Sequence, residues 1–250
     1  MPARNATDVA AQNGAKQVKA LLFDVFGTVV DWRGGISREA AAFGARNGID
    51  RDWLAFADDW RGLYQPAMEQ VRAGNRGFVR LDVLHRENLD QLFGKYGITG
   101  ISEEETDHLN RAWHRLRPWE DVLPGLHRLH RQYVLGTLSN GNIALMVNMA
   151  RNSGLPWDAV LGAEVTRSYK PMPETYLGSC EALGLRPDQC MLVAAHNGDL
   201  QAARDCGMKT AYINRPYEYG PHQKVDFEAT SDWEFIANDM VELADQIGCP

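Results

Sequence analysis

The sequence has little cysteine and no apolar stretch long enough to cross a membrane. Only four of its 250 residues are cysteines, and none of them belongs to a C-x-x-C pair or to a Cys/His cluster with zinc spacing. We therefore expect free thiols, as in a cytosolic protein, rather than disulfides or a zinc site. No apolar run approaches the roughly 20 residues that a membrane-spanning helix needs, so we expect no membrane partner.

A targeting segment and an excess of positive charge are also missing. Residues 1–18 are polar and lack the apolar centre of a signal peptide, so we predict a loose tail and a cytoplasmic location. The 26 basic and 33 acidic side chains give a formal net charge of −7. A nucleic-acid surface would need a basic stripe, so the charge argues against that partner. A small anionic substrate stays open, because one local Arg or Lys can oppose the global charge.

What is present is an alternation of strand-like and helix-like segments. The run from Ala20 to Phe23 is continuously apolar, which is typical of a strand buried on both faces of a parallel sheet. Further strands are predicted at residues 133–141, 159–165, 190–196 and 209–215, and helices at residues 121–132, 142–154, 174–184, 199–207 and 233–248. This alternation predicts an α/β fold with a doubly wound parallel sheet.

A long segment with a purely helical pattern interrupts that alternation. Residues 35–118 have helical periodicity and contain no convincing strand, so they predict an all-helical cap inserted after the first strand. The flanking segments, residues 19–34 and 119–250, then form one Rossmann-like core.

Polar side chains follow the predicted strands at the points where the strands end. They are Asp24 to Thr28, Ser139 with Asn140, Lys170, and His196 to Asp199. Each cluster alone is most simply a loop cap or a solvated charge. Because the carboxyl ends of parallel strands share one edge of the sheet, we expect the four clusters to converge into a site.

Four motifs in this order resemble those of the haloacid dehalogenase superfamily. They read FDVFGTVVD, LSNG, SYKPMPETY and AAHNGD, and the resemblance runs from residue 19 onward. It implies that Asp24 is a covalent nucleophile with Thr28 four residues later. It also implies that Lys170 supplies a positive charge paired with Asp24 and Asp199.

The position two residues after the nucleophile distinguishes the branches of this superfamily. Its phosphatases resemble D-x-D, in which the second Asp protonates the leaving oxygen, whereas this chain has Phe26. Halide is a very weak base and leaves without a proton. Ala195 stands where the phosphatases carry one of their magnesium carboxylates. The chain is therefore most similar to the 2-haloacid dehalogenases (type II), which implies neither a metal ion nor another cofactor.

The resemblance implies a reaction in two halves. Asp24 attacks the α carbon of a 2-haloacid and expels halide, and water activated near Asp199, with help from Lys170 or His196, then cleaves the ester. Arg61, in a Trp-Arg pair of the cap, would stabilise the departing halide. Thr28 would help to hold the substrate carboxylate. The substrate-binding side chains are expected to be Phe26, Ser139, Asn140, Tyr176, His196 and Asn197.

Several alternatives stay open at this point. The protein could be a magnesium-dependent phosphatase of the same superfamily, which Phe26 and Ala195 oppose. It could also be a non-catalytic binding homologue, although the nucleophile and Lys170 are both intact. His196 could be a structural donor in a tight loop, since the better-known dehalogenases have Asn there, and Arg61 could be an exposed cap residue. Homodimers are common in the family, so we expect this protein to form a homodimer.

Overall fold

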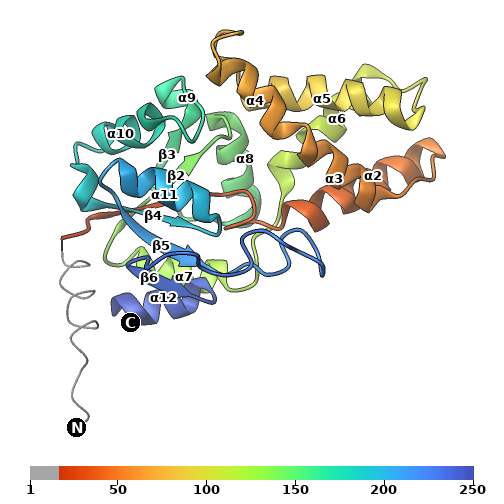
Figure 1. Cartoon of the computed structure of the whole chain (residues 1–250). Coiled ribbons are helices and arrows are strands. Elements are labelled where there is room, and N and C mark those ends of the chain that lie inside the picture. Colours follow the sequence, from red (N-terminus) through yellow and green to blue (C-terminus); the bar gives the residue numbers. More distant parts are fainter. Residues whose placement is uncertain (1–16) are drawn as a thin grey trace.

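The computed structural model describes residues 17–250, so the predicted tail over residues 1–18 falls almost entirely outside the described residues. A six-stranded parallel sheet occupies the centre, in the order β3-β2-β1-β4-β5-β6 (Figure 1). Its strands are β1 Ala20–Phe23, β2 Val134–Ser139, β3 Ala159–Gly162, β4 Cys190–Ala194, β5 Lys209–Ile213 and β6 Phe235–Ala237. The order reverses beside β1, and this is where open α/β sheets bind ligands.

The first strand is central because it is apolar on both faces. It pairs with β2 on one side and with β4 on the other, and all four of its side chains are fully buried. Leu21 and Phe23 face a core that includes helices α7 (Val122–Leu129), α8 (Ile143–Ser153) and α12 (Met240–Ile247). Leu22 faces the opposite core, with α10 (Pro173–Ala182) and α11 (Asn197–Asp205). Helices therefore cover both faces of the sheet, as the doubly wound prediction requires.

Between β1 and α7 the described chain forms helices, which lie beside one end of the sheet (Figure 1). They are α2 Trp32–Asn47, α3 Trp53–Gly62, α4 Tyr64–Arg72, α5 Leu81–Tyr96, α6 Glu103–Asn110 and the 3₁₀ helix η1 Arg111–Arg115. The predicted fold class, a Rossmann-like core with an inserted helical cap, is confirmed. Helix α2 begins at Trp32, slightly before the predicted cap boundary at residue 35. None of the helices in residues 17–250 combines the length and apolarity needed to span a bilayer.

The helix predicted at residues 233–248 was wrong, and the strand predicted at residues 159–165 extended too far. Residues 233–248 were expected to form a single helix, but they form the edge strand β6 followed by α12. Phe235 and Ala237 are buried while Ile236 is 47% exposed, which is the alternation of a strand. Asp239 then caps α12 by accepting a hydrogen bond from the backbone of Glu242.

The second difference is at residues 159–165, where the observed strand ends earlier than predicted. Strand β3 stops at Gly162 (φ +119°), and the short helix α9 (Ala163–Thr166) follows. A Cβ atom at residue 162 would lie 2.1 Å from the backbone oxygen of Ser139. Only glycine therefore lets this segment pass so close to the end of β2. The 3₁₀ helix η2 (Pro187–Gln189) completes the described elements.

Candidate active site

The predicted polar clusters meet at the carboxyl edge of the sheet, around a cavity of about 420 Å³. Eight of the predicted site residues line it, namely Asp24, Phe26, Arg61, Asn140, Lys170, Tyr176, His196 and Asp199. The core domain supplies most of them, and α3 of the cap supplies Arg61. The remaining three, Thr28, Ser139 and Asn197, are buried next to the cavity.

Asp24, directly after β1, is held by donors on both carboxylate oxygens. Lys170 Nζ donates to Oδ1 over 2.8 Å, and Thr28 Oγ1 donates to Oδ2 over 2.7 Å. His196 Nδ1 lies 3.1 Å from the same Oδ2. Burial would raise the pKa of Asp24, but the charges of Lys170 and His196 outweigh it and hold that pKa well below 3.8. Asp24 is therefore an anion, the form that a nucleophile needs.

Lys170 joins two buried carboxylates. Its Nζ contacts both Asp24 Oδ1 and Asp199 Oδ2, and its side chain is only 8% exposed. Burial would lower the pKa of Lys170, but Asp199 and Asp24 raise it overall. Tyr176 Oη donates to the other oxygen of Asp199 over 2.6 Å. The backbone N–H of Lys170 donates to Asn140 Oδ1 over 2.9 Å, so the loops of the second and third motifs are tied together.

Thr28 and Ser139 stabilise the loops of the site from within. Besides donating to Asp24, Thr28 Oγ1 accepts a 2.8 Å hydrogen bond from the backbone N–H of Ala195. This contact ties the first motif to the fourth. Ser139 Oγ accepts a 3.0 Å hydrogen bond from the backbone N–H of Gly141. Both hydroxyls are fully buried, so their contacts hold the loops in register.

Asn197 contacts a loop that is distant in sequence, and it does not line the cavity. Its Oδ1 accepts hydrogen bonds from Thr230 N and from Trp233 Nε1. Its Nδ2 donates to Asp226 Oδ1 over 2.9 Å. With both ends of the amide occupied in this way, we propose that Asn197 holds the loop that follows β5 instead of binding substrate.

Arg61 reaches the cavity from the cap, and its guanidinium lies over aromatic rings. Its Cζ is 4.2 Å from the ring centroid of Tyr64 and 5.9 Å from that of Phe26. Its Nη1 is buried, and no atom of residues 17–250 accepts a hydrogen bond from it. A buried cationic N–H without an acceptor is a ready partner for an anion that forms in the cavity.

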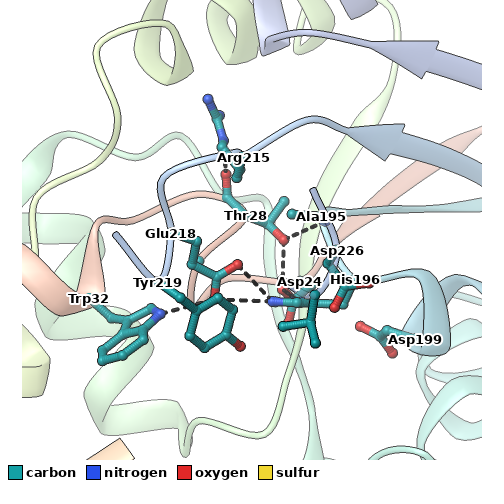
Figure 2. Close-up of polar contacts among 12 residues, drawn as sticks. Asp24, Thr28, Trp32, Ala195, His196, Asp199, Arg215, Glu218, Tyr219 and Asp226 are labelled. Carbon is teal, nitrogen blue, oxygen red and sulfur yellow. Dashed lines mark hydrogen bonds and ion pairs between the residues drawn. The ribbon is translucent and has the colours of Figure 1, made fainter. Parts of the chain in front are cut away.

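The sequence reasoning missed Glu218, in the loop after β5. Its side chain is only 1% exposed, and its carboxylate lies 3.0 Å from His196 Nε2 (Figure 2). Trp32 Nε1 donates to it over 2.9 Å. The carboxyl ends of parallel strands meet at one edge of the sheet, and this holds for the strand predicted at residues 209–215 as well as for the earlier ones. The loop that follows β5 was therefore a further place to look for site residues.

With this geometry in place, comparison with known proteins decides the family. The family model of haloacid dehalogenase-like hydrolases matches residues 18–207. The chain belongs to this family. The match extends over the cap and over all four motifs that carry the site.

Two solved structures are especially similar to this chain. A defluorinating L-2-haloacid dehalogenase shares 50% identity, with 92% of this chain and 95% of that chain covered and a TM-score of 0.91. Another L-2-haloacid dehalogenase shares 46% identity, with coverages of 93% and 100% and a TM-score of 0.90. Among curated proteins, (S)-2-haloacid dehalogenase 4A of Burkholderia cepacia is 25% identical and covers 91% of this chain and 98% of its own length.

In this haloacid dehalogenase-like hydrolase, Phe26, the residue that distinguishes a dehalogenase from a phosphatase of the superfamily, packs against other aromatic rings. Phe26 is 2% exposed and meets Trp113 edge-on at a centroid distance of 5.8 Å. Tyr64 and His85 approach the same ring at 6.5 and 6.4 Å. A carboxylate at residue 26 would lose its hydration in these surroundings. The cavity thus has an apolar wall on the side where a family phosphatase has its second acid.

Proposed function

We propose that the protein hydrolyses the carbon–halogen bond of short 2-haloalkanoic acids, and that the reaction passes through an ester at Asp24. The observation that carries the proposal is the state of Asp24, a buried anion fixed by Lys170 beside the apolar ring of Phe26. That arrangement suits attack on carbon with loss of a leaving group that needs no proton. The high similarity to L-2-haloacid dehalogenases over nearly the whole chain supports it.

In the first half-reaction an Asp24 oxygen attacks the α carbon from the side opposite the halogen. The carbon–oxygen bond forms as the carbon–halogen bond breaks, and the electron pair leaves with the halide. Arg61 Nη1 faces the growing negative charge, and Asn140 and backbone N–H groups hold the substrate carboxylate. Phe26 and Tyr64 exclude water, which strengthens these interactions.

In the second half-reaction water attacks Cγ of Asp24. The bond between Cγ and the alkyl oxygen breaks, so the Asp24 oxygen that attacked carbon leaves in the 2-hydroxy acid. Because the carbon centre was displaced from behind only once, its configuration is inverted. Lys170 and Asp199 stay paired beside the ester and stabilise the charge that develops on it.

A panel of fluoro-, chloro- and bromoacetate and both enantiomers of 2-chloropropionate tests this proposal. Ion-selective electrodes measure halide, and chromatography measures the hydroxy acid. We expect equal amounts of both products from at least one substrate. An absence of halide release across the panel would contradict the proposal.

Arg61→Ala should lower the turnover number more than it changes KM. The guanidinium stabilises a charge that grows only as halide leaves, so its loss raises the barrier from the bound substrate by about 2–4 kcal/mol, or roughly thirty- to a thousandfold. Steady-state kinetics separates the two constants. Arg111→Ala, on an exposed side chain of the same cap, is the control. A change in KM alone would make Arg61 an anchor for the substrate carboxylate instead.

Dehalogenation should continue undiminished after exhaustive chelation with EDTA. The Lys170 ammonium already lies between Asp24 and Asp199, and Phe26 and Ala195 replace two acids that a family phosphatase would have. A hard ion such as magnesium needs those oxygens. We also expect negligible hydrolysis of an aryl phosphate when magnesium is added. Loss of activity with EDTA, together with magnesium-dependent phosphatase activity, would identify a phosphatase.

We also propose a cytoplasmic location and a homodimeric state. Cys180, Cys190, Cys206 and Cys249 are all free thiols, which persist best in a reducing compartment. The expectation of a homodimer rests on the family resemblance. Light scattering coupled to size-exclusion chromatography measures the mass of the particle directly.

A further inference from the structure

The side chain of His196 lies between two carboxylates that come from different parts of the fold. Its Nδ1 is 3.1 Å from Asp24 Oδ2, and its Nε2 is 3.0 Å from Glu218 Oε2. Figure 2 shows the imidazole ring between the two carboxylates, with the indole N–H of Trp32 donating a hydrogen bond to Glu218. Both nitrogens of the imidazole are thus engaged, and one of them faces the carboxylate that becomes the ester.

Glu218 is built into the core and is not a chance surface contact. Its side chain is 1% exposed and packs directly over Gly27, in the loop of the nucleophile. A Cβ atom at residue 27 would lie 2.1 Å from Glu218 Oε1, and φ there is +92°. The loop therefore needs glycine at this position both for its conformation and to admit the carboxylate. Burying a carboxylate is costly unless a charge pairs with it, and the partner of Glu218 is the imidazole of His196 beside the nucleophile, which points to a role in the chemistry.

The charges around His196 favour its imidazolium form in the resting protein. Burial would lower the pKa of His196, but Glu218 and Asp24 outweigh it and raise that pKa well above 6.5. The other charged or titratable groups near the ring are Arg61 from the cap, Tyr212 of β5, and Tyr219 and Asp226 of the following loop. Lys170 contacts the other carboxylate oxygen of Asp24, Oδ1, and pairs with Asp199.

We propose that His196 is the general base that activates water against the Asp24 ester, and that Glu218 is the residue that positions it. The inference rests on the proposed dehalogenation, because the ester is its intermediate. It assigns to this pair the proton transfer that Asp199 would otherwise perform. Both oxygens of Asp199 already accept hydrogen bonds, one from Lys170 and one from Tyr176.

Formation of the ester itself converts His196 from an acid into a base. When Asp24 is alkylated it loses its negative charge, so one of the two anions that stabilise the imidazolium disappears. The Nδ1 proton is then released to solvent and accompanies the departing halide. Glu218 keeps the Nε2 proton in place, and the free Nδ1 lone pair faces the ester.

The hydrolytic step then balances. The water oxygen bonds to Cγ of Asp24, and one water proton moves to His196 Nδ1. The bond from Cγ to the alkyl oxygen breaks, and the second water proton moves to that oxygen to give the 2-hydroxy acid. Asp24 is again a carboxylate and His196 again an imidazolium. Over the full cycle, one water is consumed and one proton and one halide are released.

Rapid-quench kinetics on His196→Asn and Glu218→Gln tests the inference. We expect His196→Asn to release one equivalent of halide at close to the wild-type rate and then to stall, with steady-state turnover reduced about a hundredfold or more. Mass spectrometry should find the alkyl group on Asp24. Glu218→Gln should accumulate the same ester to a smaller extent. Glu228→Gln, exposed in the loop after β5, should behave as wild type.

A second measurement distinguishes a positioning role of Glu218 from a purely structural one. In ¹⁵N-histidine spectra, Glu218→Gln should lower the pKa of His196, because one stabilising charge is removed. Near-normal turnover of His196→Asn, or loss of its halide burst without ester accumulation, would overturn the inference, as would an unchanged His196 pKa in Glu218→Gln. If the wild-type protein formed neither halide nor ester, the proposed function would fail first, and this inference with it.

Discussion

Asp24→Asn should reduce halide release by about a thousandfold or more, since an amide is a far weaker nucleophile than a carboxylate. The substitution keeps the size of the side chain, and Thr28 can still donate to its oxygen. The fold should therefore persist. Halide release under saturating substrate, with circular dichroism as a check on folding, measures the effect. Asp205→Asn, at an exposed position of α11, is the matched control.

Isotope labelling tests the ester independently of that variant. In a single turnover in oxygen-18 water, label should enter the Asp24 carboxylate and not the first hydroxy acid, because water attacks Cγ. Peptide mass spectrometry locates the label. Label found directly in the first product would mean that water attacks the substrate carbon, and Asp24 would then be a base.

Lys170→Met should lower activity by about a hundredfold or more, because it removes the fixed positive charge beside Asp24 and Asp199. It leaves two buried carboxylates facing each other, so we also expect a loss of stability on the order of 3–5 kcal/mol. The pKa of Asp24 should rise for the same reason, which weakens the nucleophile further. Steady-state halide release and denaturant unfolding measure the two effects.

A double variant distinguishes lost chemistry from lost folding. Lys170→Met combined with Asp199→Asn removes one charge of each sign, so much of the stability should return while activity stays low. Lys224→Met, at an exposed loop position, controls for the substitution itself. Near-wild-type turnover in either Lys170 variant would remove Lys170 from the mechanism.

The fold could be predicted from the sequence wherever local pattern and burial coincide. Strand β1 was recognisable because a fully buried parallel strand must be apolar on both faces, as Ala20–Phe23 is. The ends of the strands then indicated where Asp24, Lys170 and Asp199 would meet. The edge strand β6 was missed because its three residues show one alternation only, too short a pattern to distinguish from the start of α12.

By itself, the sequence determined that this protein is a haloacid dehalogenase-like hydrolase with a Rossmann-like core and a helical cap, because the order of its motifs along the chain carries that information. Only the tertiary structure decided which side chains share the site. It turned Asn197 toward a neighbouring loop and brought Glu218, 22 residues after His196, within 3.0 Å of the ring. Contacts of this kind depend on the path of a loop after β5, and no local periodicity records that path, because loops follow the packing of the elements they join.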